Sequence, residues 1–322
     1  MPTDRTGPGK EGQGTQPRAG GPLADPRLLA AGAAGLVAAI LALWAFRGMP
    51  LGVVAFWAVP LPLFLAGMGF GTAALLLAAG LAGLLVWLAG TAIGAWLFLI
   101  AFGAPAALLL IAARASGGLG LPLAMLGLLP AATIVGAALW LADMPGGLEG
   151  TLRALTEAAL DSFDLADSAG LVAEIVRVQA AAIGFWVALA LLANGWLAGW
   201  MLARAGIAAP PAWSSARLPG WYAVAPGLAF GLWLAAAEGA DAVPLSLVLV
   251  LLVPLMLHGL AALHRRTRGR GGRPLLLGGV YMALLLMFVP TSLAVVGYGA
   301  FDLLRSSSNN GGGGRGAPPP RS

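Results

Sequence analysis

The chain contains no cysteine, and only two of its 322 residues are histidine. The lack of cysteine excludes disulfides, iron–sulfur clusters and thiol catalysis. Charged residues are also scarce, at 10% of the sequence, where a typical soluble domain has about 25%. The 66 residues from 48 to 113 include no Lys, Arg, Asp, Glu or His. A globular surface needs charge to stay in water, so this run excludes a soluble fold.

The uncharged parts of the sequence consist of long hydrophobic blocks, and hydrophobic residues make up 59% of the chain. At about 1.5 Å per helical residue, the uncharged run is long enough for roughly three crossings of a ~30 Å hydrocarbon core. The sequence therefore predicts an all-α, polytopic transmembrane helix bundle with eight or nine membrane helices. The expected helices cover residues 28–46, 51–69, 71–89, 91–112, 121–142, 179–203, 218–238, 243–263 and 274–300. Pro60 and Pro62 interrupt the second, and a short, broken or re-entrant segment is the alternative there.

We expect the membrane domain to cover residues 28–304. Two polar stretches flank it, and a third is inserted within it. Residues 1–27 and 305–322 are rich in Gly, Pro, Ser and charge without apolar periodicity, and predict a disordered arm and a disordered tail. The polar insertion 143–178 carries an apolar stripe beside a charged one, which predicts an amphipathic helix at the membrane interface. The expected apolar stripe is Leu148, Leu152, Leu155, Ala159 and Phe163.

Positive charge is concentrated in the loop 264–273, between two apolar blocks. Cytoplasmic loops of membrane proteins carry such an excess of arginine, so this loop and the N-terminal arm are predicted to be cytoplasmic and the insertion 143–178 external. With nine spans the C-terminal tail and Arg305 fall outside, which fits the rule poorly. The arginines do not form a docking face for nucleic acid, and no nucleic-acid partner is expected. The predicted location is the bacterial inner (cytoplasmic) membrane, with a multi-pass chain and a cytoplasmic N-terminus.

Chemical motifs are missing from the sequence. His258 and His264 do not form a His-Glu-x-x-His pair, and neither Gly-x-Ser-x-Gly nor a Walker A sequence occurs. The acidic residues lie at the ends of apolar blocks or in the insertion, away from one another along the chain. We therefore expect no enzyme activity, no catalytic residue, no cofactor and no metal site.

Polar side chains inside the expected spans are the informative ones, because burying them is costly unless they find partners. Asn194 lies in the middle of a span, near Trp186 and Trp196, and Tyr281 lies on the last expected helix. One hypothesis is a ligand pocket lined by these four residues. The alternative is that they make interhelical hydrogen bonds or anchor the helices at the interface.

The first expected helix carries small residues at a spacing of four, namely Ala30, Ala34 and Ala38. Small side chains at this spacing let a second helix approach closely and gain dispersion contacts. We interpret the ladder as a docking face for a partner helix of another membrane subunit.

Several apolar motifs, in their order along the chain, resemble the YybS-like family of uncharacterised bacterial polytopic membrane proteins (domain of unknown function 2232). The motifs are 56–67 (FWAVPLPLFLAG), 69–71 (GFG), 194–196 (NGW), 278–281 (GGVY) and 296–302 (VGYGAFD). The resemblance covers roughly residues 28–305. That family is in turn distantly similar to the substrate-binding components of energy-coupling factor transporters. The resemblance implies a helical bundle that binds a small molecule near its outer face and docks through an alanine ladder in helix one.

Two functions remain open from the sequence. The first is a small-molecule binding or transport component without its own ATPase, with the lipid bilayer, a further membrane subunit and an unknown substrate as partners. The second is a membrane scaffold or assembly factor that has no small-molecule ligand. An internal cavity lined by Trp186, Asn194, Trp196 or Tyr281 favours the first, and a solid core with an exposed groove favours the second.

Overall fold

The computed structural model describes residues 25–161, 169–209, 216–237 and 240–311, and across these ranges it is a bundle of α-helices without a strand. Seven helical segments among the described residues are long and apolar enough to cross a membrane. They are Pro26–Phe46, Gly52–Phe70, Thr72–Ala89, Ala92–Ser116, Gly120–Trp140, Gly170–Arg204 and Ala242–Arg266. The structure thus confirms the prediction of an all-α, multi-pass membrane protein.

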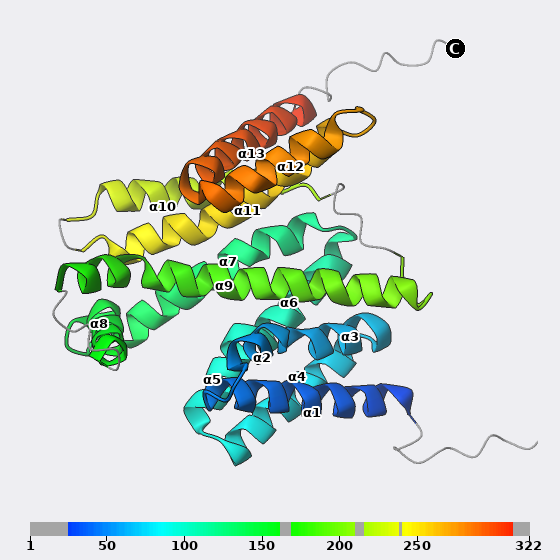
Figure 1. Ribbon diagram of the computed structural model, residues 1–322, viewed down its shortest axis with the longest axis vertical. Helices are drawn as coiled ribbons and strands as arrows, with labels where there is room; N and C mark the ends of the chain where they lie inside the picture. The colour runs from blue at the N-terminus through cyan, green and yellow to red at the C-terminus, as the bar shows by residue number, and fades with distance from the viewer. Residues whose placement is uncertain (1–24, 162–168, 210–215, 238–239, 312–322) are drawn as a thin grey trace, which may run out of the picture.

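The N-terminal unit packs four of these segments together, in blue to cyan in Figure 1. Its helices are α1 (Pro26–Phe46), α2 (Gly52–Ala58), α3 (Pro60–Phe70), α4 (Thr72–Ala89), α5 (Ala92–Phe98) and α6 (Ala104–Ser116), with a π-helical turn at Leu99–Gly103. Asp25 caps α1 by accepting a hydrogen bond from the Arg27 amide. Gly71, at φ +109°, separates α3 from α4 in a conformation that favours glycine.

The second expected span is interrupted, which is the alternative that the prolines raised. It consists of α2 and α3, which meet at Val59. Pro60 and Pro62 have no N–H, so the carbonyls four residues earlier, of Phe56 and Ala58, lose their helical donors. Val59 keeps helical dihedral angles, φ −50° and ψ −44°, so α2 and α3 together still form one segment long enough to span a membrane.

The middle of the chain forms α7 (Gly120–Trp140), α8 (Gly147–Asp161) and α9 (Ala169–Arg204). With 36 residues, α9 is about 54 Å long and exceeds a ~30 Å hydrocarbon core. This corrects the expected insertion 143–178, because its last residues, from Ala169, belong to the start of α9 rather than to a separate unit.

Helix α8 packs on α9 through a face that differs from the expected stripe. Thr156 is buried and its hydroxyl lies 2.9 Å from the Gln179 side-chain oxygen of α9, whereas Leu155 is exposed. The hydroxyl also lies 2.9 Å from the Leu152 carbonyl, so its single hydrogen has an acceptor at this buried contact. The expected apolar stripe was therefore wrong at Leu155.

The C-terminal unit runs from yellow to red in Figure 1. Its helices are α10 (Val224–Leu234), α11 (Ala242–Arg266), α12 (Arg273–Leu286) and α13 (Phe288–Gly311), with a 3-10 turn at Gly220–Ala223. The helical residues of the expected span 218–238 therefore extend only from Gly220 to Leu234, fewer than the roughly 20 that a crossing needs.

The expected ninth span, 274–300, is two helices rather than one, and this is the largest correction to the sequence analysis. The chain reverses at Met287, where φ is −132° and ψ is +60°, and α13 returns along α11 (Figure 1). Pro290 cannot donate to the Leu286 carbonyl, so a continuous helix would lack one hydrogen bond at this point. The hairpin brings the end of α13 back to the arginine loop 264–273. Helix α13 extends to Gly311, so the tail begins later than residue 305.

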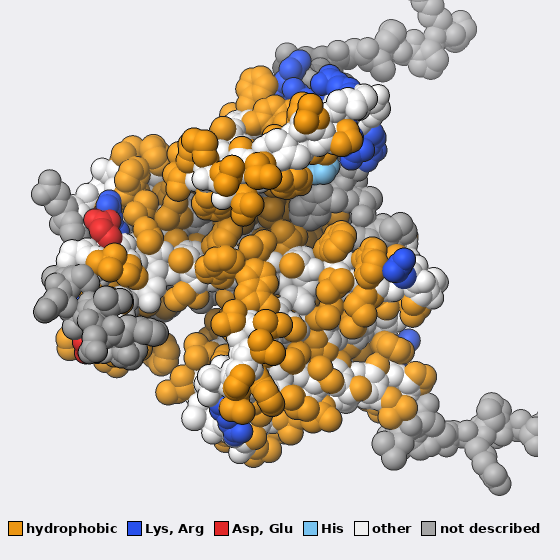
Figure 2. All heavy atoms as spheres, viewed as in Figure 1, with side chains coloured by type: hydrophobic (Ala, Val, Ile, Leu, Met, Phe, Trp, Pro, Cys, Tyr) orange, Lys and Arg blue, Asp and Glu red, His pale blue; other side chains and the backbone are white. Residues whose placement is uncertain are grey.

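The surface of the bundle is apolar. Large hydrophobic side chains cover the face seen in Figure 2, and the blue and red side chains lie near its edges. Trp140, Leu275 and Leu285 are each more than three-quarters exposed. An apolar patch of this extent does not persist in water and indicates contact with lipid.

Candidate functional site

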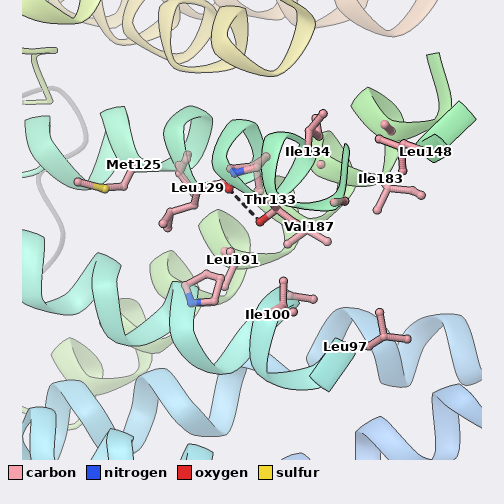
Figure 3. A pocket seen from close by; sticks show the side chains of 18 of the residues that line it. Leu97, Ile100, Met125, Leu129, Thr133, Ile134, Leu148, Ile183, Val187 and Leu191 are labelled. Atoms are coloured by element: carbon pink, nitrogen blue, oxygen red, sulfur yellow. Dashed lines mark hydrogen bonds between the residues drawn. The ribbon is translucent and has the colours of Figure 1, made fainter. Parts of the chain in front are cut away.

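Three cavities between the helices are lined almost entirely by hydrocarbon. The first, of about 210 Å³, lies between the C-terminal part of α5 and helices α6 to α9. Figure 3 shows it between Met125 and Leu129 on one side and Ile100 on the other, with Thr133 on its wall. The Thr133 hydroxyl already donates to the Leu129 carbonyl at 3.0 Å. An incoming molecule would therefore meet hydrocarbon and no side-chain polar group that lacks a partner.

The second cavity, of about 280 Å³, lies among α3, α6, α7 and α9. Phe64 of α3 and Trp196 of α9 stand on its wall. Trp196 is half exposed, so the cavity continues to the outer surface of the bundle.

The third cavity is the largest of the three, at about 540 Å³, and lies between α9, α11 and the start of α13. Phe185, Trp186 and Phe288 form an aromatic wall, with the Phe185 ring 5.6 Å from that of Trp186 and 6.0 Å from that of Phe288. Ser292 also lines the cavity, and its buried hydroxyl has no hydrogen-bond partner among the described residues. Leaving such a group unpaired costs about 1–3 kcal/mol, which a ligand oxygen or nitrogen would recover.

The four residues predicted to line a ligand pocket lie in separate places. Trp186 lines the largest cavity and Trp196 the second. Asn194 lines neither of these cavities nor the first. Tyr281 lies on α12, where its hydroxyl is 2.8 Å from Nε2 of His264 in α11. The structure therefore does not bring the four side chains together in one pocket.

Asn194 makes an interhelical contact, the second interpretation considered from the sequence. Its side chain is buried, and its amide nitrogen donates to the Trp57 carbonyl at 2.6 Å and to the Ala190 carbonyl at 2.8 Å. The Trp57 carbonyl lies between those of Phe56 and Ala58, whose helical donors the prolines remove. Asn194 thus ties α9 to the weakened turn between α2 and α3.

The alanine ladder of α1 faces other helices of the same chain, which corrects the expected docking to another subunit. Helix α1 packs on α3 and α4, with Ala38 fully buried and Ala34 9% exposed, while Ala30 is partly buried. Helix α4 presents its own buried small residues at a spacing of four, Ala74, Ala78 and Ala82. The close approach that the ladder predicted is present, but it is used inside this bundle.

The sequence analysis missed a cluster of charged and polar groups at the end of the bundle that holds the arginine loop 264–273, which we call the arginine end. The segment before the 3-10 turn has no regular secondary structure, its Ala216 and Leu218 side chains are buried, and the Leu218 amide donates to Nδ1 of His258 at 3.3 Å. The other ring nitrogen, Nε2, lies 3.4 Å from the Asp302 carboxylate. Arg265 binds both the Ala216 carbonyl, at 3.0 Å, and Asp302, at 2.8 Å.

The geometry of this cluster sets the tautomer of His258. Because Nδ1 accepts from a backbone amide, the neutral ring carries its hydrogen on Nε2, which lies near the Asp302 carboxylate but makes no hydrogen bond to a described residue. Asp302 is the only acidic residue after Asp241, within a region that holds eight arginines. That isolation was the sequence signal that could have predicted its ion pairs.

Among the described residues, no group of three His, Asp or Glu side chains could hold a metal ion. In comparisons with protein-family models, curated proteins and solved structures, nothing matches this chain. The class that the helices define is therefore a multi-pass α-helical membrane protein. The resemblance to the YybS-like family stays a prediction.

Proposed function

We propose that this protein is a membrane-embedded binding or transport component for an apolar or amphipathic small molecule, without an ATPase or an enzyme activity of its own. The observation that carries the proposal is the 540 Å³ cavity beside Trp186, with its single unpaired hydroxyl on Ser292. The resemblance to substrate-binding components of energy-coupling factor transporters supports the same function.

The lining of the cavity favours a ligand that is mostly hydrocarbon. Burying a polar ligand group without a partner costs several kcal/mol, and apart from Ser292 the cavity is walled by apolar and aromatic side chains. A ligand with one hydrogen-bonding group would place it at Ser292 and lay its hydrocarbon against Phe185, Trp186 and Phe288.

The alternative is a scaffold or assembly factor with no small-molecule ligand. The outer face of α1 supports it, because Leu36, Ile40 and Trp44 form an exposed stripe opposite the buried alanines. In that case the stripe would contact a partner protein, and the cavities would be filled by lipid tails.

We further propose that the protein lies in a bacterial inner membrane with the arginine end in the cytoplasm. The helix ends at the two sides of the bundle, which can be followed in Figure 1, differ in charge among the described residues. The arginine end carries Arg27, Arg114, Arg204, Arg217, Arg265, Arg266, Arg268, Arg270, Arg273 and Arg305, with Asp25 and Asp302. The opposite end carries Arg47, Arg153 and Arg177, with Asp143, Glu149, Glu157, Asp161, Glu174 and Asp241. This asymmetry follows the positive-inside rule.

The hairpin of α12 and α13 supports this orientation, because it returns Arg305 to the arginine end. Single cysteines can be introduced into this cysteine-free chain at Ala158 and Ser306, both exposed. A membrane-impermeant thiol reagent should label the first from the outside and the second only from the cytoplasm. Labelling of both from one side would reject the proposed topology.

The function itself is tested by filling the large cavity. Ala182 lines it, whereas Ala193 is an exposed alanine of the same helix that lines none of the three cavities. Mass spectrometry of small molecules retained by the gently purified protein should find a ligand in wild type and in Ala193→Phe, and little in Ala182→Phe. Ser292→Ala should weaken retention about fivefold, the effect of one neutral hydrogen bond of ~1 kcal/mol. Equal retention in all variants would favour the scaffold.

A further inference from the structure

A basic pocket opens at the arginine end of the bundle, away from the aromatic cavity. It has a volume of about 220 Å³ and is lined by Arg217, Arg265, Arg266, Arg305 and Asp302, together with Ser306. Four guanidinium groups thus surround one carboxylate. Asp302 accepts from Arg265 at 2.8 Å and from Arg266 at 3.3 Å, so the pocket keeps an excess of positive charge.

Arg217 is held at the rim of this pocket by its backbone rather than by its side chain. The residues on either side are fixed, since the Ala216 carbonyl accepts from Arg265 and the Leu218 amide donates to His258. The Arg217 side chain is exposed and donates no hydrogen bond to any residue that the structure describes. The backbone therefore keeps Arg217 at the rim, and its guanidinium group is open to a ligand.

An apolar groove of about 450 Å³ adjoins the basic pocket along the same helices. Leu263 and Tyr298 line the groove, and Arg266 and Asp302 line the pocket one helical turn, about 5 Å, further along α11 and α13. The Arg266 guanidinium carbon lies 5.3 Å from the centre of the Tyr298 ring and joins the two. Gly279 of α12 leaves the groove open, because a Cβ there would meet no atom within 4 Å.

We propose that the basic pocket and the apolar groove together form a binding site for an anionic phospholipid. The guanidinium groups match the geometry and charge of a phosphate. The adjoining apolar groove accommodates one acyl chain of the same lipid. Basic pockets between membrane helices bind acidic headgroups on these grounds. The site lies beyond the proposed ligand cavity and shares no lining residue with it.

The charge half of the proposal is tested with Arg217→Gln against Arg204→Gln. Arg204 lies at the same end of the bundle but lines neither pocket nor groove, so it controls for the loss of one charge. Delipidated protein in a neutral detergent is titrated with phosphatidylglycerol and with phosphatidylcholine. Arg217→Gln should bind phosphatidylglycerol about fivefold more weakly, with phosphatidylcholine unchanged, since one arginine near an anionic headgroup contributes ~1 kcal/mol. An equal effect of the two variants would overturn the basic pocket as the headgroup site.

The acyl-chain half is tested with Gly279→Leu against Gly278→Leu. Both glycines are exposed on α12, a Cβ at either position would meet no atom within 4 Å, and only Gly279 lines the groove. Gly279→Leu should weaken phosphatidylglycerol binding at least fivefold, and Gly278→Leu should leave it unchanged. Inorganic phosphate at millimolar concentration should not displace the lipid. Full displacement by phosphate, with no effect of Gly279→Leu, would mean that the pocket binds a free anion and would overturn the lipid site.

Discussion

The helices of the N-terminal unit, α1 to α6, and of the C-terminal unit, α10 to α13, pack through different kinds of contact. In α1 to α6 the helices approach closely through small residues, and Ala38, Ala78 and Ala82 are fully buried. In α10 to α13 two helices are short or broken, and the contacts include His258, Asp302 and the buried Tyr222, whose hydroxyl donates to the Leu251 carbonyl at 2.9 Å. The largest of the three apolar cavities lies at the edge of this second unit.

The difference follows from charge and backbone geometry. In a run without charged side chains, helices associate mainly through dispersion contacts, which are greatest when helices touch along small residues. Broken helices expose backbone groups that must find partners inside the protein, so buried polar side chains accompany them. The first unit packs mainly through small residues, whereas the second contains the reversal at Met287 and borders the largest of the three cavities.

The largest expected effect breaks the close packing of the first unit. A Cβ at Gly35 would lie 2.8 Å from the Ala78 carbonyl oxygen of α4, whereas one at Gly32, a turn earlier in α1, would meet nothing within 4 Å. Gly35→Leu should destabilise the protein by about 3 kcal/mol, the upper range for overpacking, because the backbone of α4 must move. Denaturant titration in detergent measures the loss, with Gly32→Leu as the control. Equal stability of the two variants would contradict close packing of α1 on α4.

A smaller loss of stability is expected when a buried polar group that has hydrogen-bond partners, Asn194, is replaced than for Gly35→Leu. Replacing one that has none, Ser292, should cost no stability. Asn194→Leu removes the hydrogen bond from α9 to the Trp57 carbonyl, and with it a bond to the Ala190 carbonyl of α9 itself, and should cost about 1–2 kcal/mol. Ser292→Ala removes a hydroxyl that has no partner among the described residues and should leave the stability of the ligand-free protein unchanged or slightly higher. The same denaturant titration measures both. If Asn194→Leu keeps full stability but loses the retained ligand, Asn194 contacts the ligand, as the ligand-pocket hypothesis from the sequence predicts.

The smallest effect concerns the ion pair that joins α9 to the start of α11. Arg177 donates to Asp241 at 2.6 Å, and this bond, helped by the Trp233 ring nitrogen, holds the pKa of Asp241 below its ordinary value. A carboxyl group with a lowered folded pKa stabilises the fold above its unfolded pKa, about 4, and loses that contribution as pH falls through the folded value. Asp241→Asn should therefore be slightly less stable than wild type at pH 7.

Lowering the pH is the control for this pair. The difference in thermal midpoint between wild type and Asp241→Asn should shrink steadily below about pH 4. A difference that stays constant down to about pH 2 would show that the carboxylate charge has no part in it.

Much of the membrane domain could be predicted from the sequence, because hydropathy reports directly on what a bilayer accepts. The first five expected spans lie within a few residues of helical segments, and the prolines at 60 and 62 predicted the interruption at Val59. The reversal at Met287 could not be predicted, since α12 and α13 together have the length and composition of one span. Only the packing of α13 against α11 shows that the chain turns back.

The candidate site was predicted less well, for a related reason. Composition identified Asn194 and Trp186 as unusual in their surroundings, but not which neighbours they meet. Asn194 meets a carbonyl of a helix more than a hundred residues earlier, and Trp186 lines a cavity that Phe288, about a hundred residues later, lines as well. Such contacts depend on the relative rotation of helices, which apolar sequences encode weakly.

By itself, the sequence determined that this chain is helical and lies in a membrane. Uncharged apolar runs of this length are stable in a bilayer rather than in water, and there the backbone must satisfy its own hydrogen bonds. It also determined that α1 packs closely on another helix, since the alanine spacing permits it. The tertiary structure alone decided that this helix is α4, that Asp302 faces His258 and the arginines, and that a cavity remains between α9, α11 and α13. These outcomes depend on where broken helices turn and which faces meet, and the small free-energy differences between such arrangements arise only when distant segments pack together.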